Sequence, residues 1–401
     1  MAQAAKSLQL GLERIAKNPK LKDDWGRVGL LCNQASLTHN FEHAHSIMQR
    51  LLGSNFKALF GPQHGIEATL QDNMIESPHE TDRTTRVPVY SLYSETREPT
   101  EEMLASVDTI VIDLQITGCR VYTFKYTMAA CLRAAKKYGK RVVILDRPNP
   151  LGGVAIDGRV LETDAKSFVG EFAIPMRHGL TLGEAARLFN AQIKADLSIV
   201  SMENWNPQAM WHELGRHWTL TSPNVPTVES IYIYPATVLI EGTNISEGRG
   251  TGLPFQFIGA PYISDSRQLV ERVMKYVGED CGVFLRPTSF QPTFQKWAGK
   301  ACAGFQIHIL DPHKLRLLDL GIAIVRSFID LGGSDFAWKQ PPYEYDYVNN
   351  PINLVMGTFL AERQFTAPHF DVHDKFWKQG LKEYGESVRE YLLYPREMRP
   401  S

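Results

Sequence analysis

The chain has 401 residues, which exceeds the length at which a single hydrophobic core usually stops growing, so we expect two packed domains. Hydrophobic residues make up 43% of the sequence and charged residues 22%, a balance that excludes a disordered chain. The formal net charge of -1 excludes the strong positive field that non-specific nucleic-acid binding requires, and so favours a small ligand.

Apolar runs alternate with helical patterns through the first half of the chain. The predicted strands cover residues 27–33, 55–60, 108–114, 141–146 and 196–200. The predicted helices lie between them, at 43–52, 99–107, 121–139 and 181–193. Gly139 suits a C-terminal cap, and Thr181 with Glu184 forms a capping box. Continuous apolar strands that alternate with helices are typical of a parallel sheet covered on both faces, so we predict a doubly wound α/β domain.

After about residue 240 the pattern changes to shorter β-like runs that are separated by proline and glycine. These runs lie at 249–263, 282–294 and 302–310, and a helical pattern follows at 314–331. We therefore predict two domains, an α/β domain at residues 1–240 and a smaller mixed α+β domain at residues 241–401.

The five cysteines are odd in number, widely spaced and free of any C-x-x-C pair, which argues against disulfides and against a cysteine zinc site. The N-terminal segment lacks the apolar core of a signal peptide, and no apolar run is long enough to span a membrane. No glycine-rich dinucleotide or phosphate-loop motif is present. We expect a cytoplasmic protein without metal, cofactor, membrane or nucleic-acid partner, and the oligomeric state stays open.

In an open parallel sheet, ligands bind beyond the carboxyl ends of the strands, where loops and helix N-termini converge. Polar side chains follow each of the first four predicted strands: Asn33; Gln63 and His64; Asp113, Gln115 and Arg120; Asp146, Arg147 and Asn149. Further polar clusters next to glycine contain Arg177, His178, Asn224, Glu241, Asn244 and Arg249. Each cluster alone is also compatible with an ordinary turn or a local salt bridge. Together they predict a site for a sugar, whose hydroxyl groups both donate and accept.

Several longer motifs follow one another along the chain, each of them present once. They read GPQHG, DLQ-x-x-G-x-R, LDRPNP, MRHGLT-x-GE, SPN-x-PT and YPATVLIEGTN-x-SEGRGT. This order resembles the NamZ-type exo-β-N-acetylmuramidases from about residue 8 to about residue 310. The resemblance implies a Rossmann-like catalytic domain, a smaller C-terminal domain and an active site in the cleft between them. It also implies removal of N-acetylmuramic acid (MurNAc) from the non-reducing end of peptidoglycan fragments during cell-wall turnover.

Muramic acid carries a lactyl carboxylate, and arginine is the side chain best shaped to hold a carboxylate. Four arginines in the motifs are candidate clamps for this group: Arg120, Arg147, Arg177 and Arg249. We expect at least one of them to bind it.

The chain departs from the family pattern at the position of the proposed catalytic acid. The family normally reads P-E-H-G after the second strand, whereas this chain has Gln63, and an amide has no proton to donate at neutral pH. Three alternatives stay open. The acid is Glu67, Asp72 or Glu76 of the same loop; it is Asp113 or Glu241 of another loop; or the protein binds muropeptides or amino sugars without hydrolysis. Gln63 itself could orient water or the N-acetyl group. We favour hydrolysis, with another acidic sugar as a further candidate substrate.

Overall fold

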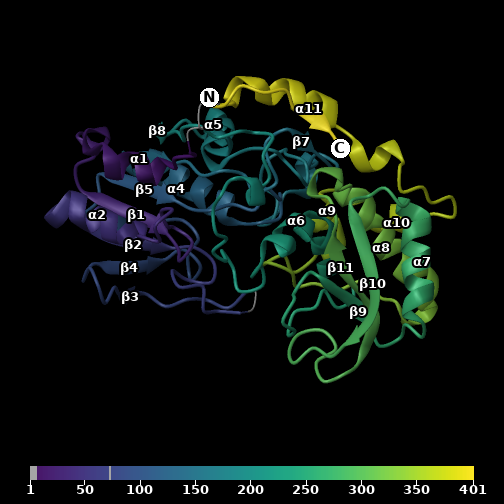
Figure 1. The fold of residues 1–401 in the computed structure, drawn as a ribbon. Coiled ribbons are helices and arrows are strands. Elements are labelled where there is room, and N and C mark those ends of the chain that lie inside the picture. Colours follow the sequence, from purple (N-terminus) through teal and green to yellow (C-terminus); the bar gives the residue numbers. More distant parts are fainter. Residues whose placement is uncertain (1–6, 72–73) are drawn as a thin grey trace.

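The computed structural model describes residues 7–71 and 74–401 (Figure 1). Seven strands form the larger sheet: β1 (Val28–Cys32), β2 (Phe56–Gly61), β3 (Glu80–Thr81), β4 (Pro88–Ser91), β5 (Thr109–Asp113), β6 (Arg141–Leu145) and β8 (Asp196–Val200). Their order is β3-β4-β2-β1-β5-β6-β8, and all neighbours are parallel except the edge pair β3–β4. Without β3, the strands follow the 3-2-1-4-5-6 order of a Rossmann fold, which confirms the predicted Rossmann-like, doubly wound sheet.

Helices cover both faces of this sheet. They are α1 (Gly11–Lys17), α2 (Ala44–Leu52), α3 (Glu101–Leu104), α4 (Phe124–Tyr138) and α5 (Leu182–Ile193). Along β5, Ile110 and Ile112 join the core under α4 and α5, whereas Val111 joins the core under α1 and α2. Successive strand residues point to opposite faces, so a strand buried on both sides has to be apolar throughout. This is why the apolar runs predicted these strands correctly.

The segment from Gly61 to Pro99, in which we predicted no strand, contains two strands. β4 pairs in parallel with β2, and the two-residue β3 pairs with β4 in the antiparallel sense at the edge of the sheet. Both are short and lie among polar residues, so their pattern is weak. Asp72, one of the candidate acids, lies outside the described residues.

A smaller antiparallel sheet lies in the second half of the chain. It contains β9 (Phe257–Ala260), β10 (Val283–Phe290) and β11 (Cys302–Ile309) in the order β10-β11-β9. It is accompanied by α6 (Val228–Thr237), α7 (Ser266–Val277) and α8 (Leu317–Gly332). The helix expected at 314–331 is α8, whereas α6 and α7 were not among the predicted elements. The predicted mixed α+β architecture of this part of the chain is thereby confirmed.

The last sixty residues contain α9 (Pro351–Met356), α10 (Ala361–Phe365), α11 (Leu381–Ser387) and β12 (Arg399–Pro400). The first part of this stretch packs beside α8, and only the segment with α11 and β12 returns to the side of the first sheet. β12 pairs in parallel with β7 (Ala155–Ile156), and Figure 1 shows this terminal segment running along the region of α5 and β7. No helix among the described residues is long and apolar enough to cross a membrane.

Candidate active site

A cavity lies between the loops that follow β2 and β5 and the segments around residues 222–255 and 343–344. It contains about 460 Å³ of space free of atoms and is open to solvent at its mouth. Its polar lining consists of Gln63, His64, Tyr122, Thr123, Ser222, Asn224, Tyr234, Glu241, Arg249, Tyr343 and Glu344. Both halves of the chain therefore contribute to one cavity.

Gln63 lies two residues after the end of β2 and is buried against the cavity wall. Thr123 Oγ1 donates to Gln63 Oε1 at 2.7 Å, which fixes the orientation of the amide. Gln63 Nε2 then donates to the hydroxyl of Tyr93 at 3.1 Å and to Glu344 Oε1 at 3.5 Å. The amide nitrogen thus points toward a carboxylate from the far end of the chain.

Glu344 is the feature that the sequence did not reveal. Its side chain is 5% exposed, and the Tyr93 hydroxyl donates to Glu344 Oε2 at 3.0 Å. Burial, together with the nearby charge of Glu241, raises the pKa of Glu344 to about 7, although the hydrogen bonds from Tyr93 and Gln63 oppose this rise. Glu344 and Tyr345 both have positive φ angles, of 44° and 66°, a strained conformation for residues other than glycine.

A second carboxylate, Glu241, lines the same cavity and is held by two donors. Arg249 Nη2 donates to Glu241 Oε1 at 2.7 Å, and the Tyr343 hydroxyl donates to Oε2 at 2.6 Å. Arg249 Nη1 also pairs with Glu247, which accepts from Lys296 at 2.9 Å. Burial alone would raise the pKa of Glu247, but Lys296 and Arg249 lower it to about 2, so this carboxylate stays ionised. Glu241, Arg249, Glu247 and Lys296 thus form a row of alternating negative and positive charges beside Glu344.

His64 and Asn224 fix the loop that carries Gln63. The ring of His64 lies 3.2 Å from the Ser222 hydroxyl through Nε2 and 2.7 Å from the Leu70 carbonyl through Nδ1. Asn224 Nδ2 donates to the Gln71 carbonyl at 2.8 Å. Of the residues predicted for the site, the cavity therefore gathers Gln63, His64, Asn224, Glu241 and Arg249.

The polar residues that follow β1, β5 and β6 lie at the point where the strand order reverses. Asp113 and Arg147 form a buried two-hydrogen-bond ion pair at 2.5 and 2.8 Å. Asn33 Nδ2 donates to the Thr221 carbonyl, and Gln115 Nε2 donates to the carbonyls of Ile116 and Pro148. In this fold these side chains hold the loops at the carboxyl edge of the sheet, and only Gln115 and Arg147 reach a narrow separate cavity beside Trp211.

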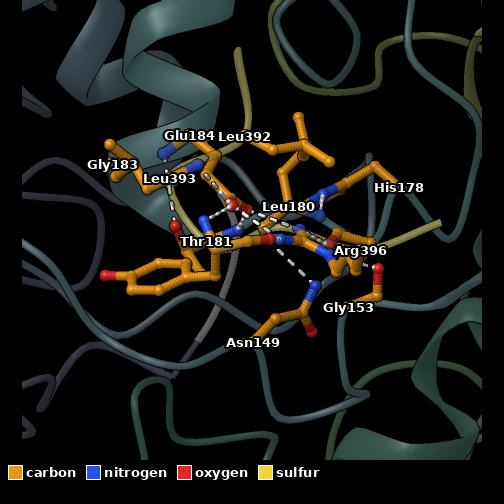
Figure 2. A network of polar contacts seen from close by, with 12 residues as sticks. Asn149, Gly153, His178, Leu180, Thr181, Gly183, Glu184, Leu392, Leu393 and Arg396 are labelled. Atoms are coloured by element: carbon orange, nitrogen blue, oxygen red, sulfur yellow. Dashed lines mark hydrogen bonds and ion pairs between the residues drawn. The ribbon is translucent and has the colours of Figure 1, made fainter. Parts of the chain in front are cut away.

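Another group of predicted residues belongs to a network that fastens the C-terminal tail (Figure 2). Glu184 Oε2 pairs with Arg396 at 2.6 Å, and Asn149 Nδ2 donates to the Leu180 carbonyl at 3.0 Å. Leu180 N donates to His178 Nδ1, and burial lowers the pKa of His178 well below its usual value, so this ring is neutral.

Asp146 belongs to the same network. It accepts hydrogen bonds from Thr181 Oγ1, Gly183 N and the Tyr394 hydroxyl, at 2.8, 2.8 and 2.7 Å. Burial and the charge of Glu184 raise the pKa of Asp146 to about 7.

The remaining predicted residues have other surroundings. Arg120 donates to the carbonyls of Arg159, Ile174 and Val355, and Arg177 donates to the Leu151 carbonyl. Asn244 Nδ2 donates to the Asp335 carbonyl and its Oδ1 accepts from Tyr262. Glu67 and Glu76 are exposed. Three of the four candidate arginine clamps thus bond backbone carbonyls or a buried aspartate.

Further residues around the cavity were missed from the sequence, among them Tyr93, which bonds to Gln63 and Glu344, and Arg97 behind Tyr345. The Arg97 guanidinium lies 3.4 Å from the centre of the Tyr345 ring and 5.6 Å from those of Tyr93 and Phe168. No ion pair or hydrogen bond joins it to another residue of the described ranges, and its Nε is buried. The only sequence signal for Glu344 was an acid between tyrosines in PPYEYDY, in a part of the chain without a clear resemblance.

Two carboxylates, an amide and tyrosine hydroxyls around one cavity form the donor set that glycoside hydrolysis uses. Within the described residues, no three His, Cys, Asp or Glu side chains are arranged to hold a metal ion. The carboxyl, amide and hydroxyl groups that line the cavity can transfer protons and bind hydroxyl groups.

Comparison with known proteins gives concordant matches over both halves of the chain. The family models for the N-terminal and C-terminal parts of the exo-β-N-acetylmuramidase NamZ match residues 28–229 and 232–394. The peptidoglycan β-N-acetylmuramidase NamZ of Bacillus subtilis is 41% identical over 389 residues, which are 96% of this chain and 91% of that protein. Two crystal structures of DUF1343 family proteins from Bacteroides fragilis each cover 97% of this chain and 99% of their own, with TM-scores of 0.86 and 0.72 at 28% and 25% identity.

Proposed function

Since the chain belongs to the NamZ family of exo-β-N-acetylmuramidases, we propose that it cleaves MurNAc from the non-reducing end of peptidoglycan fragments. The observation that carries this function is the 41% identity to the Bacillus subtilis muramidase along nearly the whole chain. The cavity supports it, because Glu241 and Glu344 face one space that is open to solvent. The protein is a glycoside hydrolase of cell-wall turnover, and nothing in the site favours the alternative of a non-catalytic binder.

We propose that the catalytic cleft lies between the two predicted domains, residues 1–240 and 241–401. The two family models divide the chain close to this boundary, and residues on both sides of it line the cavity. The tail is an exception, since β12 and the Glu184–Arg396 pair attach the last residues to the first domain. We also propose a cytoplasmic location, where the five buried free cysteines would stay reduced.

For the lactyl carboxylate of the substrate, we propose Arg97 as a clamp in addition to the four arginines named from the sequence. Arg249 lines the cavity but is held by Glu241 and Glu247, whereas the Arg97 guanidinium stacks on Tyr345 behind the cavity wall and forms no ion pair with any described residue. A charge-assisted hydrogen bond to a carboxylate contributes about 1.5–3 kcal/mol.

Arg97→Gln should therefore raise the KM for a chromogenic muraminide about 10–100-fold. The same variant should leave the KM for the muraminide's lactyl amide unchanged, because that analogue carries no charge. The exposed Arg83→Gln serves as the control. An equal rise for both analogues would contradict a clamp at Arg97.

The function itself is tested by incubating the purified protein with the disaccharide MurNAc-GlcNAc and separating the products. We expect MurNAc and GlcNAc to appear in equal amounts. Binding of the disaccharide without product, measured by calorimetry, would refute hydrolysis and support the binding alternative.

A further inference from the structure

We propose that Glu344 donates the proton that cleaves the glycosidic bond, in place of the acid that the family resemblance would put at position 63. This inference rests on the proposed hydrolase function and names the acid within its site.

The position of Glu344 fits this role. Its carboxyl group lines the cavity, and its two oxygens are held separately, Oε1 by Gln63 and Oε2 by Tyr93. Thr123 holds the other end of the Gln63 amide, so the carboxyl group is oriented by a chain of three side chains from the first domain. A catalytic acid needs such fixed geometry, because proton transfer requires hydrogen-bond reach to the leaving oxygen.

The surroundings of Glu344 bring the pKa of its carboxyl group close to neutral pH, so that it can both carry a proton and donate it. The titratable or charged side chains that surround it are Glu241, Arg249, Tyr93, Tyr343, Tyr345, His64 and, behind Tyr345, Arg97. Burial and Glu241 bring its pKa to about 7, which is the range that suits general acid catalysis.

The other candidate acids within the described residues have less suitable surroundings. Glu241 is paired with the Arg249 guanidinium, a cation that favours the ionised carboxylate, whereas the two donors on Glu344 are a neutral amide and a phenol. Glu67 and Glu76 are exposed, and Asp113 is paired with Arg147 at the carboxyl edge of the sheet.

In the step that we propose, the Glu344 carboxyl proton passes to the glycosidic oxygen while the bond between that oxygen and C1 of MurNAc breaks. The bonding electron pair stays on the oxygen, and GlcNAc leaves as an alcohol. The oxygen of one water molecule then forms the new bond to C1. One water proton is released to solvent, and the Glu344 carboxylate regains a proton from solvent.

The test compares two substrates that differ in how much they need an acid. In MurNAc-GlcNAc the leaving group is a sugar alkoxide, which has to be protonated, whereas nitrophenolate leaves from nitrophenyl MurNAc as a stable anion. Glu344→Gln should lower kcat on the disaccharide about 10²–10⁴-fold and lower kcat on the nitrophenyl substrate far less. We expect the unmodified enzyme to lose activity above neutral pH, as Glu344 ionises, and this loss should disappear in the variant.

Glu271→Gln, an exposed change on α7, is the matched control and should retain full activity on both substrates. Circular dichroism checks that each variant is folded. An equal loss on both substrates, or no loss, would overturn the assignment of Glu344 while the hydrolase function stands. An unmodified protein that releases no MurNAc from either substrate would instead refute the proposed function.

Discussion

The ion pair between Glu184 and Arg396 offers a direct test of how the tail is held. Both side chains are almost fully buried, at 0% and 4% exposure, and their atoms approach to 2.6 Å. Arg396→Met would leave Glu184 as a buried charge without its cation, a change that typically costs about 3–5 kcal/mol. The arginine also donates to the carbonyls of Gly153 and Gly179, which would lose a donor as well. We therefore expect a loss in the upper part of this range.

The measurement is urea denaturation of the variant and of the unmodified protein, followed by tryptophan fluorescence. Arg399→Met, at a side chain that is 71% exposed, is the control and should change stability by less than about 0.5 kcal/mol. Adding Glu184→Gln to Arg396→Met should recover part of the loss, because the unpaired charge is then removed. A loss below about 1 kcal/mol for Arg396→Met would refute the argument that this buried pair fastens the tail.

Three further predictions concern the carboxyl groups and a close backbone approach. Tyr93→Phe removes a donor that lowers the pKa of Glu344, so the alkaline limb of the pH–rate profile should move to higher pH; an unmoved limb would contradict this. Gly118→Ala would place a Cβ 2.3 Å from Asn149 Oδ1 at a φ of +79°, and thermal denaturation should show a loss of about 1–3 kcal/mol. The pKa of Asp146 is raised to about 7 in the folded protein, so the folded state holds its proton more tightly than the unfolded state does. The free energy of unfolding should therefore fall as pH rises from about 4 to about 7. Asp146→Asn should flatten that fall in denaturation curves at pH 5 and pH 8, and an unchanged slope would exclude this origin.

The large sheet could be predicted because each of its buried strands has a recognisable pattern within its own few residues. Each buried parallel strand has to be apolar on both faces, so β1 and β5 appear in the sequence as uninterrupted apolar runs. The helix α7 also had a readable pattern that was not used, with Asp265 as its N-cap and Leu269, Val273 and Val277 buried on one face. The helix α6 is harder to recognise, because it is buried all round and contains Pro235.

The site could be predicted only in part, because its two halves are distant in the sequence. The rule that ligands lie beyond the carboxyl ends of parallel strands led to Gln63 and His64. Glu344 is 281 residues from Gln63, and no local pattern indicates that they meet. The arginines show the same limit. Residue type suggested a clamp at Arg120, but the fold uses that guanidinium for three backbone carbonyls.

The glutamine at position 63 is compatible with catalysis because it lies beside Glu344, and the two side chains act as a pair. A glutamate there, as the resemblance leads one to expect, would bring two carboxyl groups to about the 3.5 Å that now separates Gln63 Nε2 from Glu344 Oε1. Two carboxylates so close share one proton, because both cannot be ionised together. With an amide, Gln63 supplies the shared hydrogen bond without a second negative charge. The exchange therefore leaves one titratable carboxyl group in the pair, and that group is Glu344.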